Sequence, residues 1–218
     1  MIKAVILDMD GLLIDSEPLW EEAEVEVFNK VAVPLTSEMT KQTMGLRVDE
    51  VVQYWFSRFP WESPTQQEVQ AEVVAKVIEL VKLKGTSRNG VKELVEFFRG
   101  KNIPLAIASS SQMEIINAVL DKLAIRDSLS VICSAEHEPY GKPHPGVYIT
   151  AAEKLEVQPE HCLAFEDSPN GVLSAKAAKM KCVAVPDEKM KDDKRFCIAD
   201  LMINRLTEFD EEKYKTFL

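Results

Sequence analysis

The chain has 218 residues, of which 46% are hydrophobic and 28% charged, so it can bury a globular core. Its formal net charge of −10 disfavours general binding to nucleic acids or anionic membranes, because the summed field repels polyanions. No apolar run reaches the roughly 18 residues that span a bilayer, and a strand-like segment begins beside Met1 without a signal sequence. The four cysteines are widely spaced, and we expect them to be reduced core residues. These features predict a cytoplasmic protein without nucleic-acid or membrane partners.

The first predicted strand, residues 2–7, is followed by two acidic residues two positions apart. Asp8 and Asp10 point to the same side of an extended chain, where two like charges are unfavourable unless a cation or a proton intervenes. Gly11 comes next, and Asp and Gly are also common in solvated turns. The segment by itself therefore predicts either a divalent-metal site or a solvated turn.

The segment from residue 16 to residue 84 has the pattern of several helices and contains no strong strand. Ser16 and Pro18 can begin the first helix, and residues 48–59 form the second. Thr65 begins a capping box that predicts a third helix ending near residue 83. We therefore predict a helical domain inserted after the first strand.

From residue 90 onward, apolar strand-like runs alternate with helical segments, which is typical of a parallel sheet covered on both faces. Ser111 with Glu114 predicts a capping box, and Ser168 predicts the start of a later helix. Ligands of open parallel sheets bind beyond the strand carboxyl ends, where Asp8, Ser109 and Asp167 would emerge. The predicted strands of this part are 105–108, 130–133, 162–165 and 182–185, with a weaker one at 201–203.

The predicted fold class is α/β, with a Rossmann-like, doubly wound parallel sheet as its core. Residues 1–15 and 85–218 form this core domain, and residues 16–84 form the inserted α-helical cap domain. The two linkers, 13–16 and 85–90, should lie side by side, and the second is a candidate hinge.

The string Asp8-Met9-Asp10-Gly11-Leu12 resembles the first motif of haloacid dehalogenase-like (HAD) hydrolases. Three later segments match the other motifs of this family in the expected order, and residues 10–20 and 44–49 most resemble its bacterial hexitol and 2-deoxyglucose-6-phosphate phosphatases. The resemblance implies a HAD-like core with a helical cap after the first motif. The three later segments are Leu105–Ser109, Gly141–Pro145 and Ala164–Gly171.

The resemblance implies a Mg²⁺-dependent phosphatase that hydrolyses small sugar or sugar-alcohol phosphates in carbohydrate metabolism. Asp8 is the expected nucleophile, which forms an aspartyl-phosphate, and Asp10 is the expected general acid and base. The metal ligands implied are Asp8, the main-chain carbonyl of Asp10, and Asp167, with Glu166 binding either directly or through water. Mn²⁺ or Co²⁺ are expected substitutes for Mg²⁺.

The remaining expected site residues bind the substrate. Lys142 should neutralise the reacting anions, while the Ser109 hydroxyl and the Ser110 amide should bind the phosphate. The cap should choose the substrate, because the core binds only the phosphate that all candidates share. Its candidate residues are Glu17, Trp20 and Arg47, although the helical position of Trp20 favours a core role and Glu17 fits an ordinary acidic first turn.

Two alternatives stay open at this stage. The first is a β-phosphoglucomutase-like mutase, but such mutases typically carry His near the position of Trp20 and Lys near Met44, and neither is present. The second is a non-catalytic protein that binds phosphorylated metabolites. A dehalogenase is disfavoured, because Asp10 and the Glu166-Asp167 pair suit metal-assisted phosphoryl transfer. The expected partner is a small phosphorylated metabolite, and the expected state is a monomer.

Overall fold

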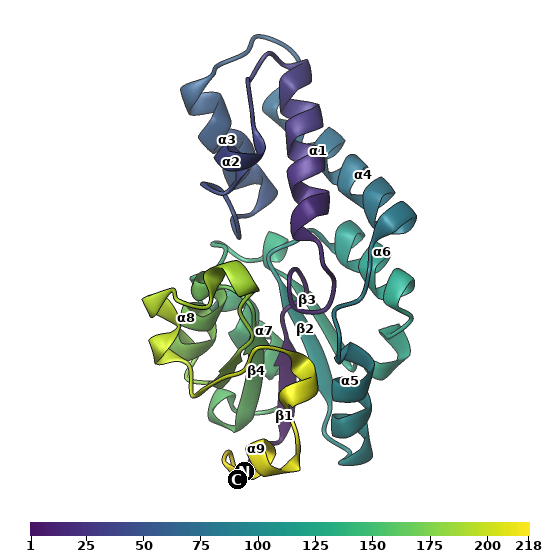
Figure 1. Cartoon of the computed structure of the whole chain (residues 1–218), viewed down its shortest axis with the longest axis vertical. Coiled ribbons are helices and arrows are strands. Elements are labelled where there is room, and N and C mark those ends of the chain that lie inside the picture. The colour runs from purple at the N-terminus through teal and green to yellow at the C-terminus, as the bar shows by residue number, and fades with distance from the viewer.

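The computed structural model describes residues 1–218 and contains one six-stranded parallel sheet. Its strand order, β3-β2-β1-β4-β5-β6, places the first strand near the middle (Figure 1). All six predicted strands are present, with ends that differ by at most two residues. They are β1 (Ala4–Leu7), β2 (Leu105–Ser109), β3 (Val131–Ser134), β4 (Cys162–Glu166), β5 (Lys181–Ala184) and β6 (Leu201–Met202).

Alternate residues of the central strand enter two separate apolar clusters. Val5 and Leu7 pack with α5 (Val91–Gly100) and α6 (Met113–Leu123) on one face of the sheet. Ala4 and Ile6 pack on the other face with α7 (Gly146–Lys154) and α8 (Pro169–Ala177). Because successive side chains of a strand point to opposite faces, this strand is buried on both sides. The prediction of a doubly wound α/β fold is confirmed.

Four helices lie between β1 and α5 in the chain and stand beyond the carboxyl end of β1 (Figure 1). The longest, α4, packs against α1, α3 and α6, so it joins these helices to the core. Apolar residues of this region, such as Val27 and Val77, belong to the same cluster as Leu7. The four helices are α1 (Glu17–Lys30), α2 (Ser37–Thr40), α3 (Val48–Arg58) and α4 (Gln66–Lys84).

The two segments that connect these helices to the sheet lie side by side. The Asp15 N–H donates to the Thr86 carbonyl at 3.0 Å, and the Arg88 N–H donates to the Leu13 carbonyl at 2.9 Å. The linkers therefore brace each other through main-chain hydrogen bonds, as their predicted pairing requires.

Of the helix starts predicted from capping residues, three are confirmed and one is wrong. Ser16 is the N-cap residue of α1, with Pro18 in its first turn. Thr65 caps α4 through the Glu68 N–H, and Ser168 caps α8. The predicted capping box at Ser111 does not form, because α6 begins at Met113 with Gln112 as its N-cap and the Ser111 hydroxyl donates to a carboxylate instead.

The remaining elements are short. A five-residue helix, α9 (Glu211–Lys215), follows the sheet. Three cysteines are buried and free as predicted, but Cys197 is exposed, because its 3-10 turn directs Phe196 inward instead. None of the helices combines the length and the apolar character that crossing a membrane requires. The 3-10 turns are Arg126–Ser128, Ala135–His137, Pro159–His161, Glu188–Met190, Lys194–Ile198 and Leu206–Glu208.

Candidate active site

The register of the sheet brings three strand ends together. Leu7 lies beside Ile107 of β2 and Phe165 of β4. The residues that follow each of these positions therefore emerge at the same edge, and these include Asp8 and Glu166. This convergence gives the sequence-separated motifs one shared location, at the base of the helices α1–α4.

Lys142 connects the acidic residues of this edge. Its ammonium donates to Asp8 Oδ1 and to Glu166 Oε1, both at 2.6 Å, and to the Ala108 carbonyl at 2.9 Å. Burial opposes the charge on Lys142, but the attraction of Asp8 and Glu166 outweighs burial and raises the pKa of the ammonium above its ordinary value. Lys142 is therefore a fixed cation next to the Asp8 carboxylate.

Three carboxylates surround a common point. One oxygen each from Asp8, Glu166 and Asp167 lies within 4.8 Å of the others. Burial, reinforced by the neighbouring carboxylates, raises the pKa of Asp8 and of Asp167 well above the ordinary aspartate value. A single Lys142 cannot balance three carboxylates, and a donor set made only of oxygen atoms suits a hard divalent cation such as Mg²⁺.

Glu166 lies behind this point and is held on both of its oxygens. Besides Lys142, the Tyr148 hydroxyl donates to Oε1 at 2.7 Å, and the Ser168 hydroxyl donates to Oε2 at 3.2 Å. Asp8 and Asp167 line the cavity in front of the sheet, whereas Glu166 does not. The geometry therefore makes Asp167 the more accessible ligand and favours an indirect role for Glu166.

Two glycines leave room for these carboxylates. A Cβ atom on Gly11, whose φ is +74°, would lie 1.9 Å from Asp167 Oδ2. A Cβ atom on Gly171 would lie 1.9 Å from the Glu166 carboxylate. Since this carboxylate is held by Lys142 and Tyr148, it cannot move aside at low cost. Glycine at these two positions therefore allows the main chain to lie close to the carboxylates of Asp167 and Glu166.

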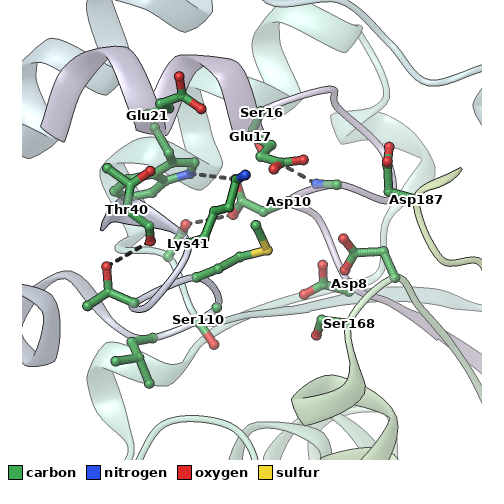
Figure 2. A pocket seen from close by; sticks show the side chains of 18 of the residues that line it. Asp8, Asp10, Ser16, Glu17, Glu21, Thr40, Lys41, Ser110, Ser168 and Asp187 are labelled. Atoms are coloured by element: carbon green, nitrogen blue, oxygen red, sulfur yellow. Dashed lines mark hydrogen bonds between the residues drawn. The ribbon is translucent and has the colours of Figure 1, made fainter. Parts of the chain in front are cut away.

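Asp10 is held from both the sheet and the helices above it. Its Oδ1 accepts from the Trp20 indole N–H at 2.9 Å, and its Oδ2 accepts from the Ser111 hydroxyl at 2.7 Å (Figure 2). Trp20 belongs to α1, and Ser111 follows β2. A carboxylate with these two donors has a fixed orientation at the cavity.

The serines after β2 divide into inner and outer positions. Ser109 is fully buried, and its hydroxyl oxygen accepts from the Ser111 N–H at 3.0 Å. Ser110 lines the cavity, and its buried hydroxyl has no hydrogen-bond partner in the protein (Figure 2). The structure thus brings Ser110 directly to the cavity and places Ser109 behind it.

Of the three predicted substrate-binding residues from the helical segment, two line the cavity. These are Glu17 and Trp20. Arg47 does not line it, because its Nη1 donates to the carbonyls of Ala135 and Glu138 at 3.2 and 3.1 Å. Arg47 therefore ties the start of α3 to the segment after β3.

Several residues of the site were not predicted. Tyr148 has no local sequence signal, because only folding brings α7 beneath Glu166. Arg88, which donates to Asp15 at 3.5 Å and to Asp187 at 3.3 Å, lines the cavity from the second linker. Glu24 also lines it, and its spacing from Glu17 and Trp20 on α1 could have revealed it.

Comparisons with known proteins agree with this geometry. Residues 2–179 match the family model of the haloacid dehalogenase-like hydrolases. The chain is 43% identical over 208 residues to hexitol phosphatase B of Escherichia coli strain K12, covering 95% of this chain and 94% of that protein. It is 31% identical over 196 residues to the phosphorylated carbohydrates phosphatase of Thermotoga maritima, covering 88% and 89%.

A solved structure gives the same fold at lower identity. The β-phosphoglucomutase of Clostridium difficile superposes with a TM-score of 0.86 at 21% identity, covering all of this chain and 97% of that chain. At this identity the likeness concerns the fold alone. Taken with the matched motifs and the convergent carboxylates, these findings show that the chain belongs to the haloacid dehalogenase-like hydrolases and is an enzyme of the phosphatase type.

Proposed function

We propose that this protein is a Mg²⁺-dependent phosphatase of sugar or sugar-alcohol phosphates that works through an aspartyl-phosphate on Asp8. The observation that carries the proposal is the pairing of Asp8 with Lys142 at 2.6 Å inside a cluster of three carboxylates. Such a site can bring an anionic nucleophile and an anionic phosphate together, because their charges are balanced locally.

The residues present fit a magnesium ion. Asp8 and Asp167 would bind it through their carboxylates, the Asp10 main-chain oxygen would add a third ligand, and Glu166 would act through water. When bound, the ion supplies positive charge that stabilises the phosphoryl oxygens during transfer. The raised pKa values of Asp8 and Asp167 support this assignment, since a site without the ion is deficient in positive charge.

The chain's own residues perform the two half-reactions. Asp8 attacks phosphorus, and the bond between phosphorus and the ester oxygen breaks as Asp10 protonates the leaving alkoxide. Asp10, now a carboxylate, then removes a proton from water, which attacks phosphorus and releases phosphate and free Asp8. The donors Trp20 and Ser111 orient Asp10 for both steps, and Lys142 stays paired with Asp8. Ser110 binds the phosphate at the cavity, and Ser109 supports this loop from behind by accepting from the Ser111 N–H.

The substrate class is proposed from the cavity and from the relatives. Residues 16–84 act as the cap, with Glu17 and Trp20 directed to the part of the substrate beyond its phosphate. The matched proteins are named as phosphatases of hexitols and of phosphorylated carbohydrates. The mutase alternative gains no support from the solved mutase, since that likeness concerns the fold alone.

A substrate panel tests this proposal. Phosphate release is measured with Mg²⁺ on hexitol, hexose, deoxyhexose and nucleotide monophosphates, with chelated enzyme and Asp8→Asn as controls. The proposal predicts turnover concentrated on sugar and sugar-alcohol phosphates and none in either control. Release of phosphate from no substrate by a folded, metal-loaded protein would refute it.

A further inference from the structure

Glu24 is a buried carboxylic acid for which the protein provides no partner. It lies on α1 with 7% of its surface exposed, and it lines the same cavity as Asp8. Its Oε2 is fully buried and has no hydrogen-bond partner. Burial alone raises the pKa of this carboxyl to about 8, so no neighbouring cation offsets the cost of its charge.

The position of Glu24 follows from the helical repeat. Glu17, Trp20, Glu21 and Glu24 all line the cavity, and their spacing places them on one face of α1. Figure 2 shows Glu17 and Glu21 of this face above Asp10. The Trp20 indole contacts Asp10, and Glu24 lies one turn farther along the axis, about 6 Å away at a rise of 1.5 Å per residue.

The surroundings of Glu24 suit hydroxyl groups. Thr40 and Thr43 line the same cavity, and each uses its hydroxyl proton on a main-chain carbonyl. Their oxygens can therefore still accept hydrogen bonds from a ligand. A protonated carboxyl adds one donor and further acceptor capacity. A ligand rich in hydroxyls can donate to both threonine oxygens and complete the hydrogen bonds of Glu24, whereas an apolar ligand would leave Glu24 without a partner.

We propose that Glu24 is a specificity-determining residue, which hydrogen-bonds hydroxyl groups of a polyol phosphate distal to the phosphoester bond cleaved at Asp8. The inference rests on the proposed function and deepens it. It accounts for an unpartnered acid in the cavity wall, because a buried polar group that lowers stability is retained where a ligand completes its hydrogen bonds.

The test compares two substrates in matched variants. We measure kcat/KM on sorbitol 6-phosphate and on p-nitrophenyl phosphate, which has no hydroxyl groups, for wild type, Glu24→Met and Glu24→Gln. Glu22→Gln is the control, since Glu22 lies on the same helix but outside the cavity and pairs with Lys84. Melting temperatures accompany each variant.

The inference predicts a selective loss. Glu24→Met should lower kcat/KM on sorbitol 6-phosphate by about tenfold to a hundredfold, the effect of one or two lost hydrogen bonds, and change the p-nitrophenyl phosphate value less than about threefold. Glu24→Gln should lose less, and neither variant should melt below wild type. Equal losses on both substrates, or no loss on either, in a folded variant would overturn the inference.

Failure of the proposed function has a different signature. If wild type hydrolyses no sugar or sugar-alcohol phosphate, the proposed function fails and the role of Glu24 fails with it. If wild type hydrolyses sorbitol 6-phosphate and the ratio between the two substrates is unchanged in Glu24→Met, only the inference about Glu24 fails. The isosteric Glu24→Gln keeps the comparison usable if the methionine variant does not fold.

Discussion

Because Glu24 is buried without a partner, we expect the free energy of unfolding to depend on pH by an amount that can be calculated. The ordinary pKa of a glutamate is 4.5, and burial raises that of Glu24 to about 8. The folded protein therefore retains a proton that the unfolded chain releases between these two values. Because the native state then binds more protons, the free energy of unfolding falls as pH rises through this window. The difference corresponds to an upper limit of about 5 kcal/mol at about 1.4 kcal/mol per pH unit.

Glu24→Gln removes this titration while keeping the shape of the side chain. We expect wild type and variant to have similar stability at pH 5, and the variant to become more stable by about 2–5 kcal/mol at pH 8.5. For a chain of this length, that difference raises the melting temperature by roughly 5–20 °C.

Urea unfolding of the metal-free protein between pH 5 and pH 8.5 measures this difference directly. The titrations of the carboxylates around Lys142 are common to both proteins and cancel in the comparison. Glu22→Gln, at an exposed ion pair on the same helix, should change stability by less than about 1 kcal/mol. Stability curves of wild type and Glu24→Gln that stay parallel within about 0.5 kcal/mol would refute the burial of an unpartnered Glu24.

Three further predictions concern the catalytic cluster. Trp20→Phe keeps an aromatic side chain but removes the 2.9 Å hydrogen bond to Asp10, so kcat should fall by about tenfold to a hundredfold with a smaller change in KM; unchanged steady-state kinetics would contradict this positioning role. Lys142→Met leaves two carboxylates buried without their cation, so it should destabilise the metal-free protein by about 3–5 kcal/mol at neutral pH. Urea unfolding measures this loss, and the control Lys181→Met, at an exposed ion pair, should cost less than about 1 kcal/mol. Because the pKa of Asp167 is raised, Mg²⁺ must displace protons from the cluster when it binds, and this displacement becomes easier as pH rises. The increase in melting temperature caused by Mg²⁺ should therefore grow from pH 5 to pH 8 and be largely lost in Asp167→Asn, whereas an increase independent of pH would argue against this site.

Much of the fold could be predicted from periodicity. The fully apolar runs that became β1, β2 and β4 belong to strands buried on both faces, and Thr65 and Ser168 marked helix starts correctly. Local rules failed at Ser111, since its hydroxyl is drawn to the carboxylate of Asp10, a partner 101 residues away in the chain. A capping pattern describes only the hydrogen bonds available nearby in the sequence, and a side-chain acceptor that folding brings close can take the donor instead.

For the candidate site too, some residues could be predicted from the sequence, whereas others depend on contacts that only the fold creates. The acidic motifs and Lys142 were found from the sequence because their order along the chain resembles the four motifs of haloacid dehalogenase-like hydrolases, whereas each motif alone also fits an ordinary turn or helix start. Tyr148 and Arg88 were not found, since their roles depend on which helix or linker the fold places beside them. Arg47 was predicted to bind the substrate, because its cationic side chain suits a phosphate. In the folded protein this side chain donates to main-chain carbonyls instead.

The covalent role of Asp8 is the central claim, and trapping the phosphorylated enzyme tests it most directly. Enzyme mixed with Mg²⁺ and sorbitol 6-phosphate is quenched in acid within the first turnover, digested and analysed by mass spectrometry. We expect one phosphoryl group on the peptide that contains Asp8, and none in Asp8→Asn, which should also release no phosphate. A phosphoryl group on another residue, or undiminished phosphate release by a folded Asp8→Asn, would contradict the account.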